Sequence, residues 1–264
     1  MTKLPSLFIS HGSPDIAISD TAARDFLRTF TRNVPRPSVI VVVSAHFEAG
    51  GVAITGDAKP ETIHDFGGFA PELYKIRYAA PGCPALAQRV ACMMHAGGLA
   101  AGVVDHRGFD HGTWVPLCLM YPDADIPVVQ VSVDPHAGPD HHCRLGRALA
   151  PLREENILVI GSGSMTHNLR EAMAALRSGD RDAMVPSWVG QFVSWMQDRI
   201  EAGDEAALLD YRDRAPYAVE NHPTDEHLMP LFSAIGAAGD GWKSTKLHGS
   251  TDFGVLAMDA YAFN

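Results

Sequence analysis

Three histidines of this chain lie where runs of apolar, strand-like residues end. His11 and His46 follow such runs directly, and His167 follows one after a short turn of glycine and serine. The runs are residues 6–10, 39–45 and 157–160. In an open α/β sheet, ligands bind in the crevice outside the carboxyl ends of the strands. Because neutral imidazole is the commonest metal ligand, this placement predicts a metalloenzyme.

The local sequence separates these histidines from an ordinary surface or structural histidine. His11 and His46 stand in turns of small residues just past strands that we expect to be buried, where an imidazole without a partner is unfavourable. Each could instead bond a backbone carbonyl, but we favour metal ligation for both. The connection to His167 is looser, and placement alone leaves ligation and a structural role equally open for it.

His227 is a further candidate metal ligand. It lies in the segment 221–227, which is dense in side chains that can bind metals. The segment leads into a predicted helix. A capping turn accounts for Asp225 and Glu226, because acidic side chains are favoured at the positive end of a helix dipole. It does not account for a cationic histidine, whereas a neutral His227 bound to a metal is consistent with that position.

Two loops carry a histidine close to glycine. They are residues 64–69, which contain His64, and residues 109–112, which contain His111. Glycine lets the backbone approach a ligand closely. Each loop is therefore interpreted as part of the wall of a substrate pocket or, alternatively, as a plain polar turn. The histidines at 95, 106, 136, 141 and 142 lie in predicted helices or polar turns and are interpreted as structural, and His248 is left unassigned.

The composition limits the classes of function. The chain has 264 residues, of which 46% are hydrophobic and 20% charged, as in ordinary globular enzymes. A formal charge of -10 argues against nucleic acid or an anionic membrane as partner, because both require a basic surface. We find no apolar stretch that could span a bilayer, no signal peptide, no P-loop and no G-x-S-x-G turn. The four cysteines lack paired spacing, so we expect reduced thiols in a cytoplasmic protein.

Strand-like and helical segments alternate through the first two thirds of the chain. This alternation predicts βαβ units, and hence an α/β fold in which one central, largely parallel (mixed) sheet has helices on both faces. We expect a single domain over residues 1–264. The predicted strands are 7–10, 39–44, 52–55, 101–104, 127–133, 157–160 and a weak edge strand at 255–260. The predicted helices are 21–31, 84–95, 141–152, 169–176, 186–201, 204–211 and 225–238, the last with Thr224 as N-cap.

Seven short segments match those of a known family, in the same order and over nearly the whole chain. They are residues 10–14 (SHGSP), 41–46 (VVVSAH), 63–69 (IHDFGGF), 108–112 (GFDHG), 121–127 (YPDADIP), 167–170 (HNLR) and 223–227 (PTDEH). With them the chain resembles the class III extradiol ring-cleavage dioxygenases, in the branch of the 4,5-DOPA dioxygenase extradiol enzymes. That branch is related to the catalytic B subunit of protocatechuate 4,5-dioxygenase.

The resemblance implies roles for individual residues. His11, His46 and His227 match the metal ligands of the family. His167 matches its catalytic acid/base, which can approach the metal when no substrate is bound. His111 matches a second catalytic histidine that contacts substrate or dioxygen, and His64 is assigned only to the substrate pocket.

The implied ligands bear on the choice of metal. The protocatechuate enzymes use two histidines and a carboxylate, the triad of non-haem Fe²⁺ oxygenases, whereas His227 stands here in place of the carboxylate. An all-histidine site suits zinc, which also binds more tightly than Fe²⁺. We therefore expect one divalent metal per chain, zinc in the isolated protein and Fe²⁺ for turnover. Glu226 is a reserve ligand, although neighbours on a helix point about 100° apart and are not expected to share one ion.

The implied reaction is the opening of the ring of a DOPA-like catechol by O₂, with His167 taking a proton from the substrate. One alternative is a zinc-dependent, redox-neutral hydrolase or lyase on the same fold, because zinc activates water. Another is a protein that binds a metal without catalysis, against which the surplus histidines His167 and His111 argue. The expected partners are a small catechol and O₂, and a homo-oligomer is compatible with the sequence.

Overall fold

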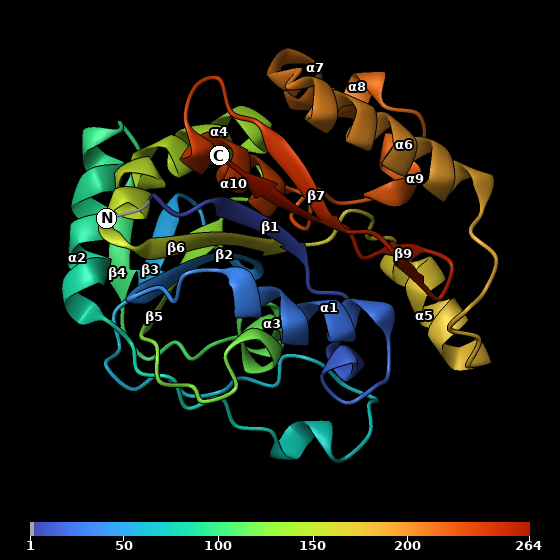
Figure 1. Cartoon of the computed structure of the whole chain (residues 1–264), viewed down its shortest axis with the longest axis horizontal. Helices are drawn as coiled ribbons and strands as arrows, with labels where there is room; N and C mark the ends of the chain where they lie inside the picture. The colour runs from blue at the N-terminus through green and yellow to red at the C-terminus, as the bar shows by residue number, and fades with distance from the viewer. Residues whose placement is uncertain (1–2) are drawn as a thin grey trace.

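The backbone is organised around a mixed sheet with helices on both faces (Figure 1). The computed structural model describes residues 3–264. From edge to edge the strands are β4 (Ala101–Val104), β3 (Val52–Thr55), β5 (Val128–Val133), β2 (Val39–Glu48), β6 (Ile157–Gly163), β1 (Ser6–Ser10), β10 (Ala260–Phe263) and β7 (Ser244–His248). A separate hairpin pairs β8 (Thr251–Asp252) with β9 (Leu256–Ala257). The α/β fold expected from the sequence is confirmed.

The centre of the sheet is parallel and buried. Strands β5, β2, β6 and β1 are parallel neighbours, and antiparallel pairs flank them on both sides. In β2, Val41 and Val43 enter one core while Ile40 and Val42 enter the other, because successive side chains point to opposite faces. Runs of β-branched residues such as this one are typical of strands covered on both faces.

The helices divide between the two cores. They are α1 (Ala22–Phe30), α2 (Pro84–Ala96), α3 (His111–Met120), α4 (Gly138–Leu149), α5 (Leu169–Ser178), α6 (Ser187–Ala202), α7 (Glu205–Leu209), α8 (Tyr211–Arg214), α9 (Ala218–Asn221) and α10 (Met229–Ala238). Residues of α2, α4, α6 and α10 form one core with the sheet, and residues of α1 and α3 belong to the other. Over residues 3–264, none of these helices has the length and apolarity needed to cross a membrane.

Helix α3 was not among the predicted helices. It is buried on nearly all sides, so it has no polar face, and its apolar residues do not follow a helical period. Pro116 inside the helix also obscures it in the sequence. The side chain of Asp110 caps its first turn by accepting the backbone N–H of Thr113, which places His111 at the start of the helix.

The C-terminal third differs from the prediction in two respects. The segment 255–260 holds the short strand β9 and only the first residue of β10, and β10 lies inside the sheet between β1 and β7 instead of at an edge. The edge strand β7 is only partly buried and was not predicted. Helix α10 begins at Met229, with a proline in its first turn, and Thr224 is not its N-cap. His227 therefore lies in a turn before the helix.

Helix α10 packs closely against α4. A Cβ atom on Gly236 would lie 2.1 Å from the carbonyl oxygen of Cys143, a distance that no side chain tolerates. Glycine at this position lets the two backbones meet. Because α10 follows His227 directly, this close approach also helps to set the position of that histidine.

We expect Gly236→Ala to lower the free energy of unfolding by about 1–3 kcal/mol, the usual cost of overpacking a core. Urea-induced unfolding followed by circular dichroism measures the change. Gly190→Ala is the matched control, because a Cβ on Gly190 in α6 meets no atom of the described chain within 4 Å. That variant should be more stable by about 0.5–1 kcal/mol. Equal stability of the two variants would contradict the close packing of α10 on α4.

Candidate metal centre

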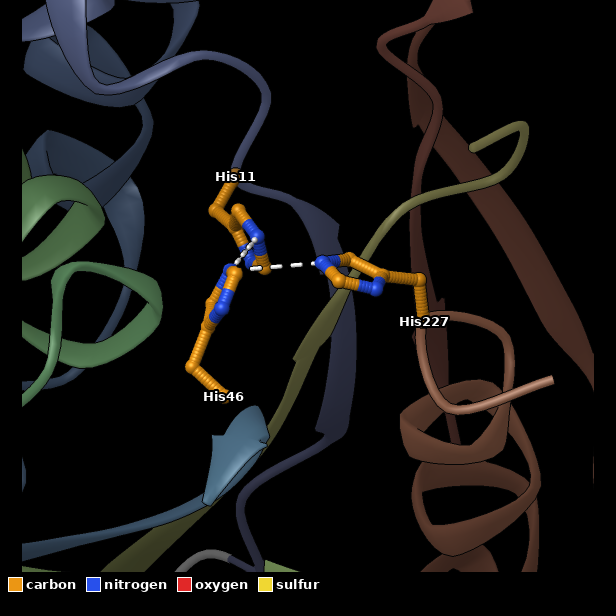
Figure 2. Close-up of side chains that lie close together, drawn as sticks. All are labelled: His11, His46 and His227. Atoms are coloured by element: carbon orange, nitrogen blue, oxygen red, sulfur yellow. Dashed lines mark hydrogen bonds between the residues drawn. The ribbon is translucent and has the colours of Figure 1, made fainter. Parts of the chain in front are cut away.

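Three imidazole rings converge at the end of the parallel strands (Figure 2). His11 comes from the end of β1, His46 from β2 and His227 from the turn before α10. The Nε2 atom of His46 lies 3.0 Å from Nε2 of His11 and 3.2 Å from Nε2 of His227. Each ring can thus offer one nitrogen to the same ion.

Hydrogen bonds at Nδ1 of His11 and of His227 show which nitrogen of each ring carries the proton. Ser162 donates its hydroxyl proton to the carbonyl of Gly112, so its oxygen can only accept from Nδ1 of His11, 3.0 Å away. A carboxylate oxygen of Glu226 accepts from Nδ1 of His227 at 2.8 Å. A neutral imidazole has one N–H, so both rings present an unprotonated Nε2 to the centre.

The third ring has the same orientation. Nδ1 of His46 lies 3.8 Å from the carboxylate of Asp65, and its Nε2 faces the other two. Burial, reinforced by neighbouring histidines, lowers the pKa of His11, His46 and His227 well below the usual value. His11 and His227 therefore each direct an Nε2 lone pair at Nε2 of His46, and one ion can be shared by the three neutral rings. The donor set fits a divalent metal.

A bulge in β2 brings His46 to the centre. Ser44 pairs with Ser132 of β5, but the next pair joins Glu48 to Val133, so the residues between them leave the regular ladder. The expectation that His46 follows the strand is thus wrong, because β2 continues to Glu48. Bulges re-aim side chains in this way. Ser44 also donates a hydrogen bond of 2.7 Å to Asp110, which ties the bulge to the start of α3.

The end of β6 joins the other two ligands. This strand continues to Gly163, where a turn was expected. The carbonyl of Gly163 accepts the backbone N–H of His11 at 2.9 Å, and the backbone N–H of Ser164 donates to the carbonyl of His227 at 2.8 Å. A Cβ on Gly163 would lie 2.1 Å from that His227 oxygen, so glycine permits the approach.

A carboxylate links His111 to the centre. Asp65 accepts from Nδ1 of His111 at 2.9 Å and from its backbone N–H at 3.0 Å. Burial alone would raise the pKa of Asp65, but these hydrogen bonds outweigh it and lower the pKa to about 2. The carboxylate also faces His46 and thus belongs to the site.

Sequence reasoning selected His64 from this loop and missed Asp65. Among the described residues that line the cavity at the centre, Asp65 is present and His64 is not. Nε2 of His64 lies 3.2 Å from the carbonyl of Ile76. His64 is therefore not among the described residues that line this cavity, and its neighbour Asp65 is. No signal in the sequence separates the two, because Asp65 is not adjacent in sequence to any of the ligand candidates.

His167 stacks on a metal-ligand candidate. Its ring centroid lies 3.4 Å from that of His227, with 9° between the planes, and its Nδ1 lies 3.8 Å from Glu226. Burial lowers the pKa of His167 to about 4, so the ring is neutral at pH 7. Glu226 and His227 were expected to point about 100° apart as neighbours on a helix. Both residues precede α10, so that expectation does not apply to them. Glu226 hydrogen-bonds His227.

The centre opens into a cavity of about 440 Å³, a size typical of sites for small molecules. Histidines and two carboxylates form one end of it, and the remaining wall is largely apolar. The polar end consists of His11, His46, His111, His167, His227, Asp65 and Glu226. The geometry thus joins a metal-binding end to a pocket for an organic molecule.

Comparison with known proteins identifies the family. Residues 6–258 match the model described as the catalytic LigB subunit of aromatic ring-opening dioxygenase. The chain belongs to the LigB family. The match covers nearly all of the strands and helices described above, including each candidate ligand.

Curated LigB relatives and a solved structure match over most of the chain. The "4,5-DOPA dioxygenase extradiol" of Beta vulgaris is 40% identical, with 98% of this chain and 96% of the relative covered. The Escherichia coli K12 protein of the same name is 38% identical, with 89% and 86% covered. The crystal structure of an uncharacterized Escherichia coli K12 protein aligns with a TM-score of 0.77 at 30% identity, covering 98% and 99%.

We expect Ser162→Ala to weaken metal binding about 10- to 100-fold, because His11 loses the acceptor that holds its Nδ1 proton. Competition with a chelating dye for Zn²⁺ measures the affinity. Ser6→Ala is the matched control: Ser6 lies in β1, the strand that leads to His11, and its buried hydroxyl donates to the carbonyl of Ala234 at 2.7 Å. The control should lose stability and keep its affinity. Native Zn²⁺ affinity in Ser162→Ala would refute the role of Ser162.

Proposed function

We propose that this chain is a metal-dependent extradiol dioxygenase, which opens a catechol ring with O₂ beside the two hydroxyls. The proposal depends on one observation above all, the convergence of three histidine Nε2 atoms at the polar end of a cavity in a LigB-family chain. DOPA is the first catechol to test, because the curated relatives are named for it.

We assign His11, His46 and His227 as the ligands of one divalent metal per chain. A redox-active metal held there supplies the chemistry by which O₂ reacts with a catechol, and zinc does not. The all-nitrogen donor set and the usual order of affinities favour zinc, so zinc is expected in the isolated protein and Fe²⁺ in the working enzyme. Asp65 and Glu226, behind two of the ligands, provide negative charge that the histidines lack.

His167 and His111 are assigned to proton transfer. The neutral ring of His167 borders the cavity, where an imidazole can accept the proton of a catechol hydroxyl and later return it. His111 is oriented by Asp65 through Nδ1, which leaves its Nε2 for the substrate or dioxygen. The apolar walls keep water away from the ring. A cytoplasmic location and a homo-oligomer stay predictions.

The zinc hydrolase or lyase is the less favoured function. The donor set alone suits it, since three histidines commonly hold a catalytic zinc. Membership in a family of ring-opening dioxygenases and the relatives' names support the dioxygenase instead.

Oxygen uptake with exchanged metals tests the proposed function. Protein stripped of metal and reloaded anaerobically with Fe²⁺ should consume O₂ and catechol in equal amounts. The same protein loaded with Zn²⁺ should consume neither, because zinc has no redox chemistry. An oxygen electrode and absorbance of the ring-opened product record the result. Absence of uptake with both metals, over a panel that includes DOPA and catechol, would refute the proposal.

We expect His167→Ala to lower kcat about 10²- to 10⁴-fold, the usual contribution of a general acid or base. The three ligands are untouched, so metal content, measured by elemental analysis, should match the native protein. His95→Ala, an exposed position on α2, is the control and should keep native turnover. Native turnover in His167→Ala would show that another group moves the proton.

A further inference from the structure

We infer that the site is built for a catechol whose ring substituent is uncharged and apolar. This inference rests on the proposed function and narrows the substrate class that the cavity accepts. It differs from what the relatives' names suggest, because DOPA carries both a carboxylate and an ammonium group.

One face of α5 forms a long apolar wall of the cavity. Leu169, Ala172, Met173 and Leu176 line it at the spacing i, i+3, i+4 and i+7, which places them on one side of the helix. At a rise of 1.5 Å per residue, this wall is about 10 Å long. It is long enough for a substituent of several carbon atoms.

Aromatic and aliphatic side chains from other elements line the same cavity. Phe253 and Leu256 come from the region of the β8–β9 hairpin, which lies beside α5 in Figure 1. Phe66 and Phe69 come from the loop that also holds Asp65, and their ring centroids lie 5.5 Å apart. Apolar groups thus surround the space outside the polar end.

The cavity offers no counter-charge for an anion. Within the described part of the chain, no lysine or arginine lines it, and its two acidic side chains, Asp65 and Glu226, already accept hydrogen bonds from His111 and His227 at the polar end. Burying a carboxylate without a partner costs several kcal/mol. The hydroxyl of Ser13 lines the cavity and is buried, but a neutral hydroxyl does not balance a full charge.

Two arginines near the cavity are already paired. Arg181 forms ion pairs with Asp15 and Asp252, the second at 2.7 Å, and its guanidinium lies 4.3 Å from the ring centroid of Phe253. Arg107 pairs with the buried Asp110 at 3.1 Å and donates to the carbonyl of His46 at 3.0 Å. Both guanidinium groups thus already have carboxylate partners, and neither lines the cavity in the described part of the chain.

Three catechols whose chains have nearly the same shape test the inference. 4-Propylcatechol, dihydrocaffeate and dopamine end in a methyl, a carboxylate and an ammonium group, respectively. Dissociation constants come from anaerobic calorimetry on Fe²⁺-loaded protein, and kcat/KM comes from oxygen uptake. We expect 4-propylcatechol to bind at least 10-fold more tightly than the other two and than DOPA. Equal or tighter binding of dihydrocaffeate, dopamine or DOPA would overturn the inference.

A pair of variants at Met173 tests the wall itself. Met173→Lys places a cation of similar length on α5, and it should improve the affinity for dihydrocaffeate relative to 4-propylcatechol at least 10-fold. Met173→Gln is the matched control, polar without a charge, and should leave the relative affinities within about 3-fold of native. An unchanged ratio in Met173→Lys would show that the substituent does not contact α5.

The dissociation constants test this inference, and the oxygen uptake tests the proposed function, so the failure of one can be distinguished from the failure of the other. Tighter binding of 4-propylcatechol without ring opening would support the apolar substrate class and refute the dioxygenase. Ring opening of all four catechols with equal affinities would support the dioxygenase and overturn the apolar substrate class.

Discussion

The metal centre depends on the hydrogen bonds made by three consecutive residues at the end of β6. Ser162 sets the proton on the ring of His11, Gly163 binds the backbone of His11, and Ser164 binds the backbone of His227. This strand lies in the middle of the parallel part of the sheet, paired on both sides, so its end has little freedom to move. Two ligands that are distant in sequence are therefore held by one short rigid segment.

Carboxylates behind the ligands shape the electrostatics of the site. Asp65 and Glu226 each lie beside a ligand and a catalytic candidate, Asp65 by His46 and His111, and Glu226 by His227 and His167. In this position an acid orients the imidazole and increases its basicity as a ligand. It also leaves space at the centre for substrate and O₂. A site of three neutral histidines thus gains negative charge without using a carboxylate as ligand.

The sequence predicted the fold class and much of the site because both follow from simple patterns. Buried apolar runs marked the central strands, and His11 followed one of them directly. The sequence could not show α3, whose apolar residues have no period, or the bulge that carries His46, which depends on pairing with β5. It also could not choose between His64 and Asp65, since neighbours in a loop can face opposite sides. These features depend on tertiary contacts.

The spread of the three proposed ligands along the chain has a consequence for how a metal would be acquired. His11 and His46 are 35 positions apart, whereas His227 comes 181 positions after His46. During synthesis, two ligands leave the ribosome long before the third, and a pair of histidines cannot impose the geometry that selects one ion. A site made of all three histidines therefore exists only once the chain is nearly complete and folded. Bound metal in turn favours the folded state over every unfolded one, so metal loading and folding are a single coupled equilibrium.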